Sequence, residues 1–138
     1  MKEEDYVSFE VAKDLNDKGY KQPYDEDCYR YGDDGKRYWY SRIGSYETVD
    51  KVTDYHQRPN TTYPCASLSE AQKWLREEKQ IWVYVYPEYY QTIEYRVRIV
   101  TFDNLVDDRK NKGTILHLWF EKYEQALNLG IREALKMI

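Results

Sequence analysis

The sequence predicts an α+β domain in which an antiparallel sheet carries helices packed mainly on one face. Apolar residues recur with helical spacing in three segments, near the start, in the middle and at the end of the chain. Between them lie runs rich in tyrosine, valine, isoleucine and threonine, which strands favour. The expected order of elements is α-β-β-(loop)-α-β-β-β-α, within a single domain over residues 1–138.

Residues 1–45 are expected to form a helix followed by a hairpin. In YVSFEVAKDLNDKGY, Ser8 suits the N-cap position and Gly19 suits a left-handed cap at the C-terminal end. In CYRYGDDGKRYWY, the pair Asp34-Gly35 predicts a two-residue hairpin turn. Because side chains alternate along strands, four rings would then share one face as a tyrosine ladder. The expected cross-strand pairs of this ladder are Tyr31 with Tyr38 and Tyr29 with Tyr40.

Residues 46–66 show no clean hydrophobic period, and we expect a long loop there. A short strand or helical turn is expected within it, near residues 46–52. Loops of this length inside a compact domain are often functional. Arg58 is the cation that this loop could bring to a ligand.

Residues 67–138 are expected to form an α-β-β-β-α core. Ser67 and Glu70 have capping-box spacing at the start of SLSEAQKWLREEKQ, which carries a helical apolar stripe. IWVYVY predicts a strand that stops at Pro87, TIEYRVRIVTF a second strand and TILHLWF a third. The segment KYEQALNLGIREALKMI is an amphipathic helix, in which Gly130 is expected to permit close packing on the sheet.

Composition and charge argue against several functional classes. The chain has 138 residues and a formal net charge of −4, with both signs mixed along it. Coating duplex DNA or RNA requires a basic face, so no duplex nucleic acid is expected as a partner. The order α-β-β-β-α also occurs in double-stranded-RNA-binding domains, but Glu121 and Glu124 near the start of the last helix would repel phosphates. The absence of a signal peptide and of a long apolar run predicts a cytoplasmic protein with no membrane partner.

The cysteines and histidines give no sign of a metal centre. Cys28 and Cys65 form no metal-binding motif, and His56 and His117 have no partner at ligand spacing. No serine or cysteine lies in a recognisable nucleophile motif, so we expect no catalytic residue, no metal and no cofactor. A nucleotide-degrading enzyme stays open as an alternative, because an acid–base pair of carboxylates cannot be recognised from sequence alone.

The sequence contains 16 tyrosines and only 3 phenylalanines, which indicates rings that keep a polar edge in water. A buried ring needs no hydroxyl, and a buried hydroxyl needs a partner. Aromatic platforms hold bases by stacking, and arginine forks hold phosphates. The hairpin is therefore the candidate ligand-binding site, and the residues expected to bind are Tyr29, Tyr31, Arg37, Tyr38, Tyr40, Arg42 and Arg58.

Arg96 and Arg98 form a second paired cationic row on a central strand of the predicted sheet. An acidic protein with local clusters of tyrosine and arginine suits a small anionic aromatic ligand, of nucleotide type, better than a long polymer. In a competing interpretation, the tyrosine ladder packs on the first helix and the arginines pair with carboxylates. The ladder could instead form a protein–protein interface, because Tyr, Trp and Arg dominate such surfaces.

Three segments resemble a family of small uncharacterised proteins from Bacteroidetes bacteria, their mobile elements and their phages. The segments are MKEEDYVSFEVAKDLNDKGY, SLSEAQKWLREEKQIWVYVY and YEQALNLGIREALKMI. The resemblance implies a short accessory protein in the cytoplasm of a bacterial host cell, and it carries no activity with it. The dense tyrosines at residues 29–40 depart from the family pattern.

Together these observations predict a non-catalytic anti-defence protein that binds and sequesters a nucleotide-type signalling molecule. We expect a homo-oligomer, because pockets shared between subunits can enclose a small ligand almost completely. The alternatives are a protein-interaction module or inhibitor that acts through an aromatic face, and a nucleotide-degrading enzyme.

Overall fold

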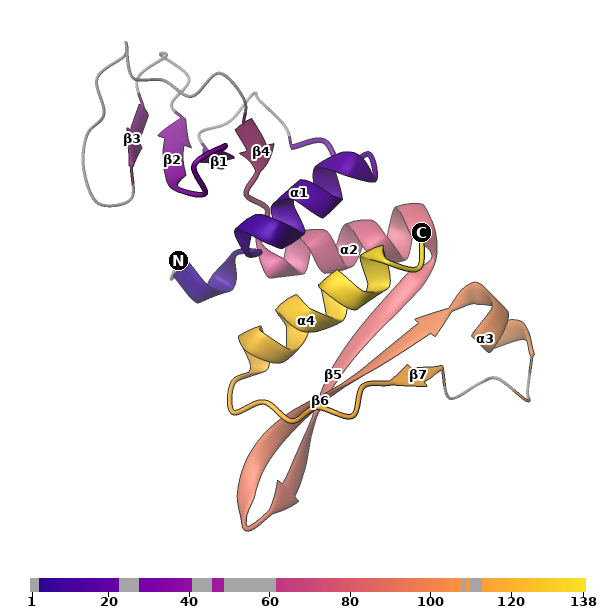
Figure 1. Ribbon diagram of the computed structural model, residues 1–138. Helices are drawn as coiled ribbons and strands as arrows, with labels where there is room; N and C mark the ends of the chain where they lie inside the picture. Colours follow the sequence, from indigo (N-terminus) through magenta and orange to yellow (C-terminus); the bar gives the residue numbers. More distant parts are fainter. Residues whose placement is uncertain (1–2, 23–27, 41–45, 49–61, 108, 110–112) are drawn as a thin grey trace. The chain divides into compact units, whose positions relative to one another are not determined.

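The computed structural model describes residues 3–22, 28–40, 46–48, 62–107, 109 and 113–138 (Figure 1). The chain is α+β, as predicted, and divides into two compact units. The N-terminal unit is residues 6–67, and the C-terminal unit is residues 68–138 together with residues 1–5. Each unit has its own antiparallel sheet, so the expectation of one shared sheet is wrong. The grouping of residues 1–138 into one domain stays a prediction.

The N-terminal unit combines helix α1 (Phe9–Asp17) with a four-stranded sheet of order β3-β2-β1-β4. Its strands are β1 (Cys28–Gly32), β2 (Arg37–Tyr40), β3 (Tyr46–Thr48) and β4 (Thr62–Pro64). The predicted caps of α1 are confirmed. The Ser8 side chain accepts a hydrogen bond from the Val11 amide, and Gly19 has a φ of +98°. Strands β3 and β4 lie within the segment predicted as a loop, and both pair with the hairpin.

The turn between β1 and β2 has three residues rather than the predicted two. The Gly32 amide donates to the Lys36 carbonyl at 2.9 Å, and Gly35 has a φ of +80°, which closes a turn with a left-handed glycine. One extra loop residue shifts the register by one and moves every β2 side chain to the other face. The prediction of a tyrosine ladder is therefore wrong. The observed pairs are Tyr31 with Arg37, Arg30 with Tyr38, Tyr29 with Trp39 and Cys28 with Tyr40.

The C-terminal unit contains the three-stranded sheet β5-β6-β7. Its elements in chain order are a 3-10 turn (Glu3–Asp5), α2 (Leu68–Lys79), β5 (Ile81–Tyr90), β6 (Thr92–Thr101), α3 (Phe102–Val106), β7 (Thr114–Ile115) and α4 (Tyr123–Leu135). The short helix α3 was not expected. Strand β5 continues through Pro87, contrary to prediction, because β5 is an edge strand and proline is tolerated there.

The third predicted strand, TILHLWF, is interrupted by a bulge. β7 has only two residues, and beyond it the Leu116 amide still donates to the Val97 carbonyl at 3.0 Å. Tyr95 and Phe120 then exchange backbone hydrogen bonds of 2.8 and 3.0 Å. Residues 117–119 consequently stand opposite Arg96 alone, and they lie exposed at the edge of the sheet.

Helix α4 covers one face of the sheet in the C-terminal unit. A Cβ atom on Gly130 would lie 2.6 Å from Val83 Cγ1 and 2.8 Å from Val97 Cγ1, so only glycine allows this approach. The predicted role of Gly130 is therefore confirmed. Helix α2 packs against α4 and β5, and Figure 1 shows the two helices beside β5. Within the described residues, no helix is both long and apolar enough to cross a membrane.

Candidate functional site

The hairpin residues expected to bind a ligand are partly used as packing in the N-terminal unit. Tyr31 is only 8% exposed, and its hydroxyl donates to the Val7 carbonyl at 2.6 Å. The Phe9 ring, in the first turn of α1, lies 5.5 Å from the Tyr31 ring between centres. This is the arrangement of the competing interpretation, in which a hairpin tyrosine packs on the first helix.

Arg37 is also buried, and aromatic rings surround it. Its guanidinium carbon lies 5.2 Å from the centre of the Tyr6 ring and 5.6 Å from that of Tyr29. Tyr29 in turn makes an edge contact with Trp39 at 4.8 Å. Burial raises the pKa of the nearby Cys65 thiol to about 12, although Arg37 and Tyr31 act in the opposite direction. Arg37 is thus enclosed by rings and a neutral thiol.

Tyr38 lies on the opposite face of the hairpin from Tyr31 and is 6% exposed. Its hydroxyl donates to Asp34 Oδ2 at 2.6 Å, and Asp34 Oδ1 accepts from the Lys36 amide at 2.9 Å. The structure therefore brings Tyr29, Tyr31 and Arg37 together and separates Tyr38 from them. The side chain of Tyr40, and the whole of Arg42 and Arg58, lie outside the described residues. A ligand-binding role for the seven residues stays a prediction.

The C-terminal unit offers a different surface, on the sheet face that points away from α4. Tyr84 pairs directly with Arg98, and Tyr86 pairs with Arg96. Because side chains alternate along a strand, these four residues face away from Val83 and Val97, which contact α4. The paired cationic row predicted for Arg96 and Arg98 is confirmed on β6, the central strand of this sheet.

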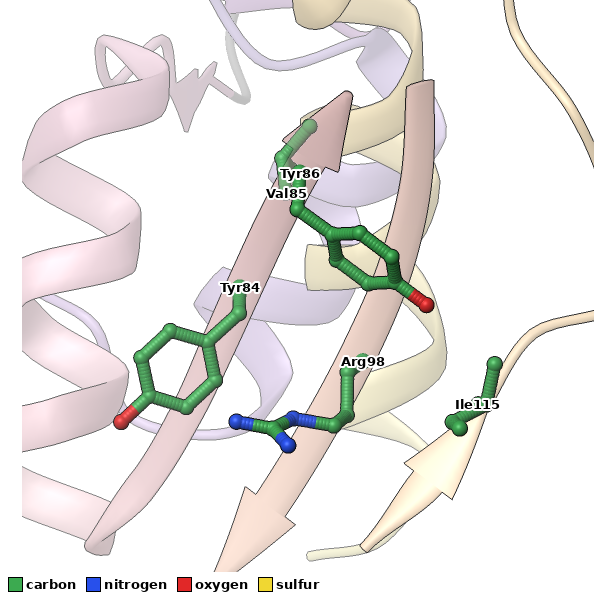
Figure 2. A pocket seen from close by; sticks show the side chains of 5 residues that line it. All are labelled: Tyr84, Val85, Tyr86, Arg98 and Ile115. Carbon is green, nitrogen blue, oxygen red and sulfur yellow. The ribbon is translucent and has the colours of Figure 1, made fainter. Parts of the chain in front are cut away.

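A pocket of about 460 Å³ opens on this face and is lined by Tyr84, Val85, Tyr86, Arg98 and Ile115. In Figure 2 the Arg98 side chain extends from β6 toward the Tyr84 ring on β5. The guanidinium carbon lies 5.1 Å from the centre of that ring. Within the part of the chain that the structure describes, Arg98 makes no ion pair or hydrogen bond through its side chain. The pocket therefore contains an aromatic face and an oriented cation with open donors.

Arg96 is more firmly held than Arg98. Its guanidinium carbon lies 4.5 Å from the centre of the Trp119 ring, and one nitrogen lies 3.7 Å from Glu88 Oε1. Another nitrogen donates to the Leu116 carbonyl at 3.4 Å, whereas the buried Nε has no partner in the described structure. Trp119, by contrast, is half exposed and belongs to the bulge opposite Arg96.

Sequence reasoning found the two arginines of this face and missed its rings. The alternation in TIEYRVRIVTF places Arg96 and Arg98 on one side, and the same alternation in IWVYVY places Tyr84 and Tyr86 together. The signal for the two tyrosines was therefore present in the sequence. No comparable signal existed for Trp119, because its position depends on the bulge.

The described residues contain no group of three or more His, Cys, Asp or Glu side chains that could hold a metal ion. No protein family, curated protein or solved structure matches this chain. The resemblance to proteins of Bacteroidetes and their phages thus stays a prediction.

Proposed function

We propose that this protein binds a small anionic aromatic ligand of nucleotide type, without chemical conversion, on the open sheet face of the C-terminal unit. One observation carries the proposal. Arg98 lines a pocket of about 460 Å³, stacks on Tyr84 at 5.1 Å and has no carboxylate partner within the described residues. Pockets for small ligands are typically about 300–1,000 Å³, so a nucleotide fits this volume.

The lining residues supply the two kinds of contact that a nucleotide needs. The Tyr84 and Tyr86 rings offer faces on which a base can stack, and Ile115 adds an apolar wall. The Arg98 guanidinium offers a planar fork of donors that suits a phosphate group. Tyr84 is 42% exposed, so a base can reach it without rearrangement of the core. With a net charge of −4, the protein attracts an anion only through such a local site.

This assignment moves the ligand site away from the hairpin of the N-terminal unit. The buried hydroxyls of Tyr31 and Tyr38 already have acceptors in Val7 and Asp34. The Tyr84–Arg98 pair, in contrast, keeps its polar edges available. Sequestration of a signalling molecule, an anti-defence role and homo-oligomer formation remain expectations that depend on the identity of the ligand.

Isothermal titration calorimetry with adenosine and uridine monophosphates, cyclic mononucleotides and ADP-ribose tests the proposal. We expect at least one of them to bind, and Arg98→Gln to weaken binding about tenfold or more, because a hydrogen bond to a charged group is lost. Arg76→Gln, at an exposed position on α2, is the matched control and should bind like the unaltered protein. Ligand recovered unchanged after heating distinguishes capture from cleavage. The proposal is abandoned if none of these nucleotides binds.

A second candidate function is protein binding through the tip of the β5–β6 hairpin. Tyr89 and Tyr90 are 78% and 81% exposed there, and Ile93 is exposed as well. Exposed apolar residues that gather at one place mark interaction sites. Sedimentation of the unaltered protein and of the variant Tyr89→Ser/Tyr90→Ser tests whether the tip joins copies of the chain. Self-association that the variant loses supports this function, and a monomer at about 100 μM counts against it.

A further inference from the structure

The open face of the C-terminal sheet carries two similar rows of side chains. The first row runs from Tyr84 through Arg98 to Ile115, which are direct partners across the three strands. The second row runs from Tyr86 through Arg96 to Trp119. In each row an arginine lies next to at least one aromatic ring. The arrangement is a repeat in space that the amino-acid sequence does not contain as a repeat.

The spacing of the two rows follows from strand geometry. Arg96 and Arg98 are two residues apart on β6, so the rows are separated by about 7 Å along the strand. Proteins that hold single-stranded nucleotides place successive bases on successive aromatic side chains and use cations along the linking backbone. Sheet faces are suitable platforms, because their aromatic residues can stack two or three bases.

The bulge at residues 117–119 completes the second row. It inserts two additional residues opposite Arg96, and Trp119 is thereby placed over the Arg96 guanidinium at 4.5 Å. Trp119 remains 48% exposed, so its indole has a face available to a ligand. Bulges commonly re-aim one side chain in this way. Without the bulge, the third segment would continue in the register of β7 along β6.

The two arginines differ in how open they are to phosphate. Glu88 lies 3.7 Å from Arg96 and partly neutralises it, whereas Arg98 has no carboxylate partner in the described residues. The linking phosphate of a ligand would therefore bind to Arg98. One base would stack on Tyr84 and the other on Trp119, beside the partly neutralised Arg96.

The residues at the two ends of this face limit the length of the ligand. Beyond the second row, Glu88 pairs directly with Glu94, and these carboxylates would repel a further phosphate. Beyond the first row, Trp82 pairs with Val100, which is buried and carries no charge. The arrangement of an arginine beside an aromatic ring therefore occurs in two rows and does not continue beyond them.

We infer that the ligand of this face has two nucleoside units joined through a phosphate, with its bases on Tyr84 and Trp119 and its phosphate on Arg98. This inference rests on the proposed function and specifies the ligand class. It applies to a free dinucleotide and to the end of a longer single strand, which share this chemistry.

Calorimetry with AMP, the dinucleoside monophosphate ApA and single-stranded hexa-adenylate tests the inference, with UMP and UpU as a second set. We expect ApA or UpU to bind about tenfold or more tightly than the matching mononucleotide, because a second base is stacked. A hexa-adenylate strand offers several pairs of neighbouring bases. After a statistical correction for that number, it should bind no more tightly than ApA. Equal affinities for hexa-adenylate and ApA would indicate that the end of a longer strand also binds to this face.

The variant Trp119→Ala should lower the affinity for the dinucleotide to that for the mononucleotide and leave the mononucleotide unaffected. Leu118→Ala, in the same bulge and similarly exposed to solvent, is the matched control. The inference is overturned if the dinucleotide binds no better than the mononucleotide, if Trp119→Ala weakens both equally, or if hexa-adenylate binds much more tightly than ApA. In these cases the proposed function survives. If no nucleotide binds, both fail together.

Discussion

The guanidinium carbon of Arg98 lies 5.1 Å from the centre of the Tyr84 ring, and the two residues are direct partners across β5 and β6. A guanidinium that stacks on a ring is held in orientation while the donors at its edge stay available. The opposite case exists in the other unit, where Arg37 is buried among Tyr6 and Tyr29. Both arginines contact aromatic rings, but Arg37 is enclosed by them as packing, whereas the proposed function uses the open edge of Arg98 for binding.

Because Tyr84 is 42% exposed, its contribution to binding should be separable from its contribution to stability. We expect Tyr84→Ala to weaken nucleotide binding by about 1–3 kcal/mol, the value of one stacked base. The free energy of unfolding should change by less than about 1 kcal/mol, as at other exposed positions. Calorimetry and urea denaturation measure the two quantities. Tyr90→Ala, at the exposed hairpin tip, is the control that should change neither, and a Tyr84→Ala protein with unaltered affinity would contradict the assignment.

Gly130 provides a test of the packing between α4 and the sheet. Alanine normally favours a helix over glycine by about 1 kcal/mol. Here its Cβ would lie 2.6 Å from Val83 Cγ1, and such overpacking usually costs about 1–3 kcal/mol. The helix preference offsets part of the overpacking cost, so we expect Gly130→Ala to lower the free energy of unfolding by up to about 2 kcal/mol, measured by urea denaturation.

Gln125 is exposed in the same helix, and Gln125→Ala is the control for Gly130→Ala. This substitution should leave the free energy of unfolding nearly unchanged. A second variant isolates the steric cause. Val83→Ala removes the closer of the two methyl groups that the new Cβ would meet, so the double variant should be more stable than the sum of the single effects predicts. A stabilised Gly130→Ala protein would show that α4 lies farther from β5 than described.

Local sequence patterns predicted the elements whose determinants are local. The Ser8 cap, the left-handed Gly19 and the close approach at Gly130 each depend on a few neighbouring residues. The hairpin register failed because a two-residue turn and a three-residue turn ending in left-handed glycine have the same Asp-Gly signature. A difference of one residue then moved Tyr38 to the opposite face from Tyr31.

The candidate site was predictable only in part. Alternation along one strand placed Arg96 and Arg98 together, because it requires no knowledge of other strands. The pairing of Arg98 with Tyr84 depends on the register between β5 and β6, and β5 was expected to stop at Pro87. The position of Trp119 depends on a bulge, for which the sequence carries no local signal.

The hydrogen bond from Tyr38 to Asp34 should make stability depend on pH in acid. Burial tends to raise the pKa of Asp34, but hydrogen bonds from Tyr38 and the Lys36 amide outweigh it, and the net shift is downward from 3.8. A lowered pKa means stabilisation that is present above about pH 4 and is lost as the pH falls through the folded-state value. We expect Tyr38→Phe to cost about 1 kcal/mol at pH 7 and less at pH 3, measured by urea denaturation.

Tyr63→Phe is the matched control for Tyr38→Phe, because the Tyr63 hydroxyl has no hydrogen-bond partner in the described part of the chain. Its effect on the free energy of unfolding should be small and equal at both pH values. A Tyr38→Phe effect that stays constant between pH 7 and pH 3 would show that the Asp34 carboxylate is not the partner that matters.

Cys65 should behave as an unreactive buried thiol, and its burial should make the protein lose stability at alkaline pH. Burial raises its pKa from 9.0 to about 12, so the folded protein keeps the proton that the unfolded chain releases. Stability from this source is complete below pH 9 and is lost progressively as the pH rises from 9 toward 12.

In a Cys28→Ser background, we expect iodoacetamide at pH 8.5 to alkylate folded Cys65 far more slowly than the urea-unfolded chain, since the thiolate is the nucleophile. Adding Cys65→Ala should flatten the fall in free energy of unfolding between pH 8 and pH 10 relative to that background. Comparable alkylation rates for folded and unfolded protein would mean that the thiol is accessible, and that the enclosure formed by Tyr31 and Arg37 does not exist in solution.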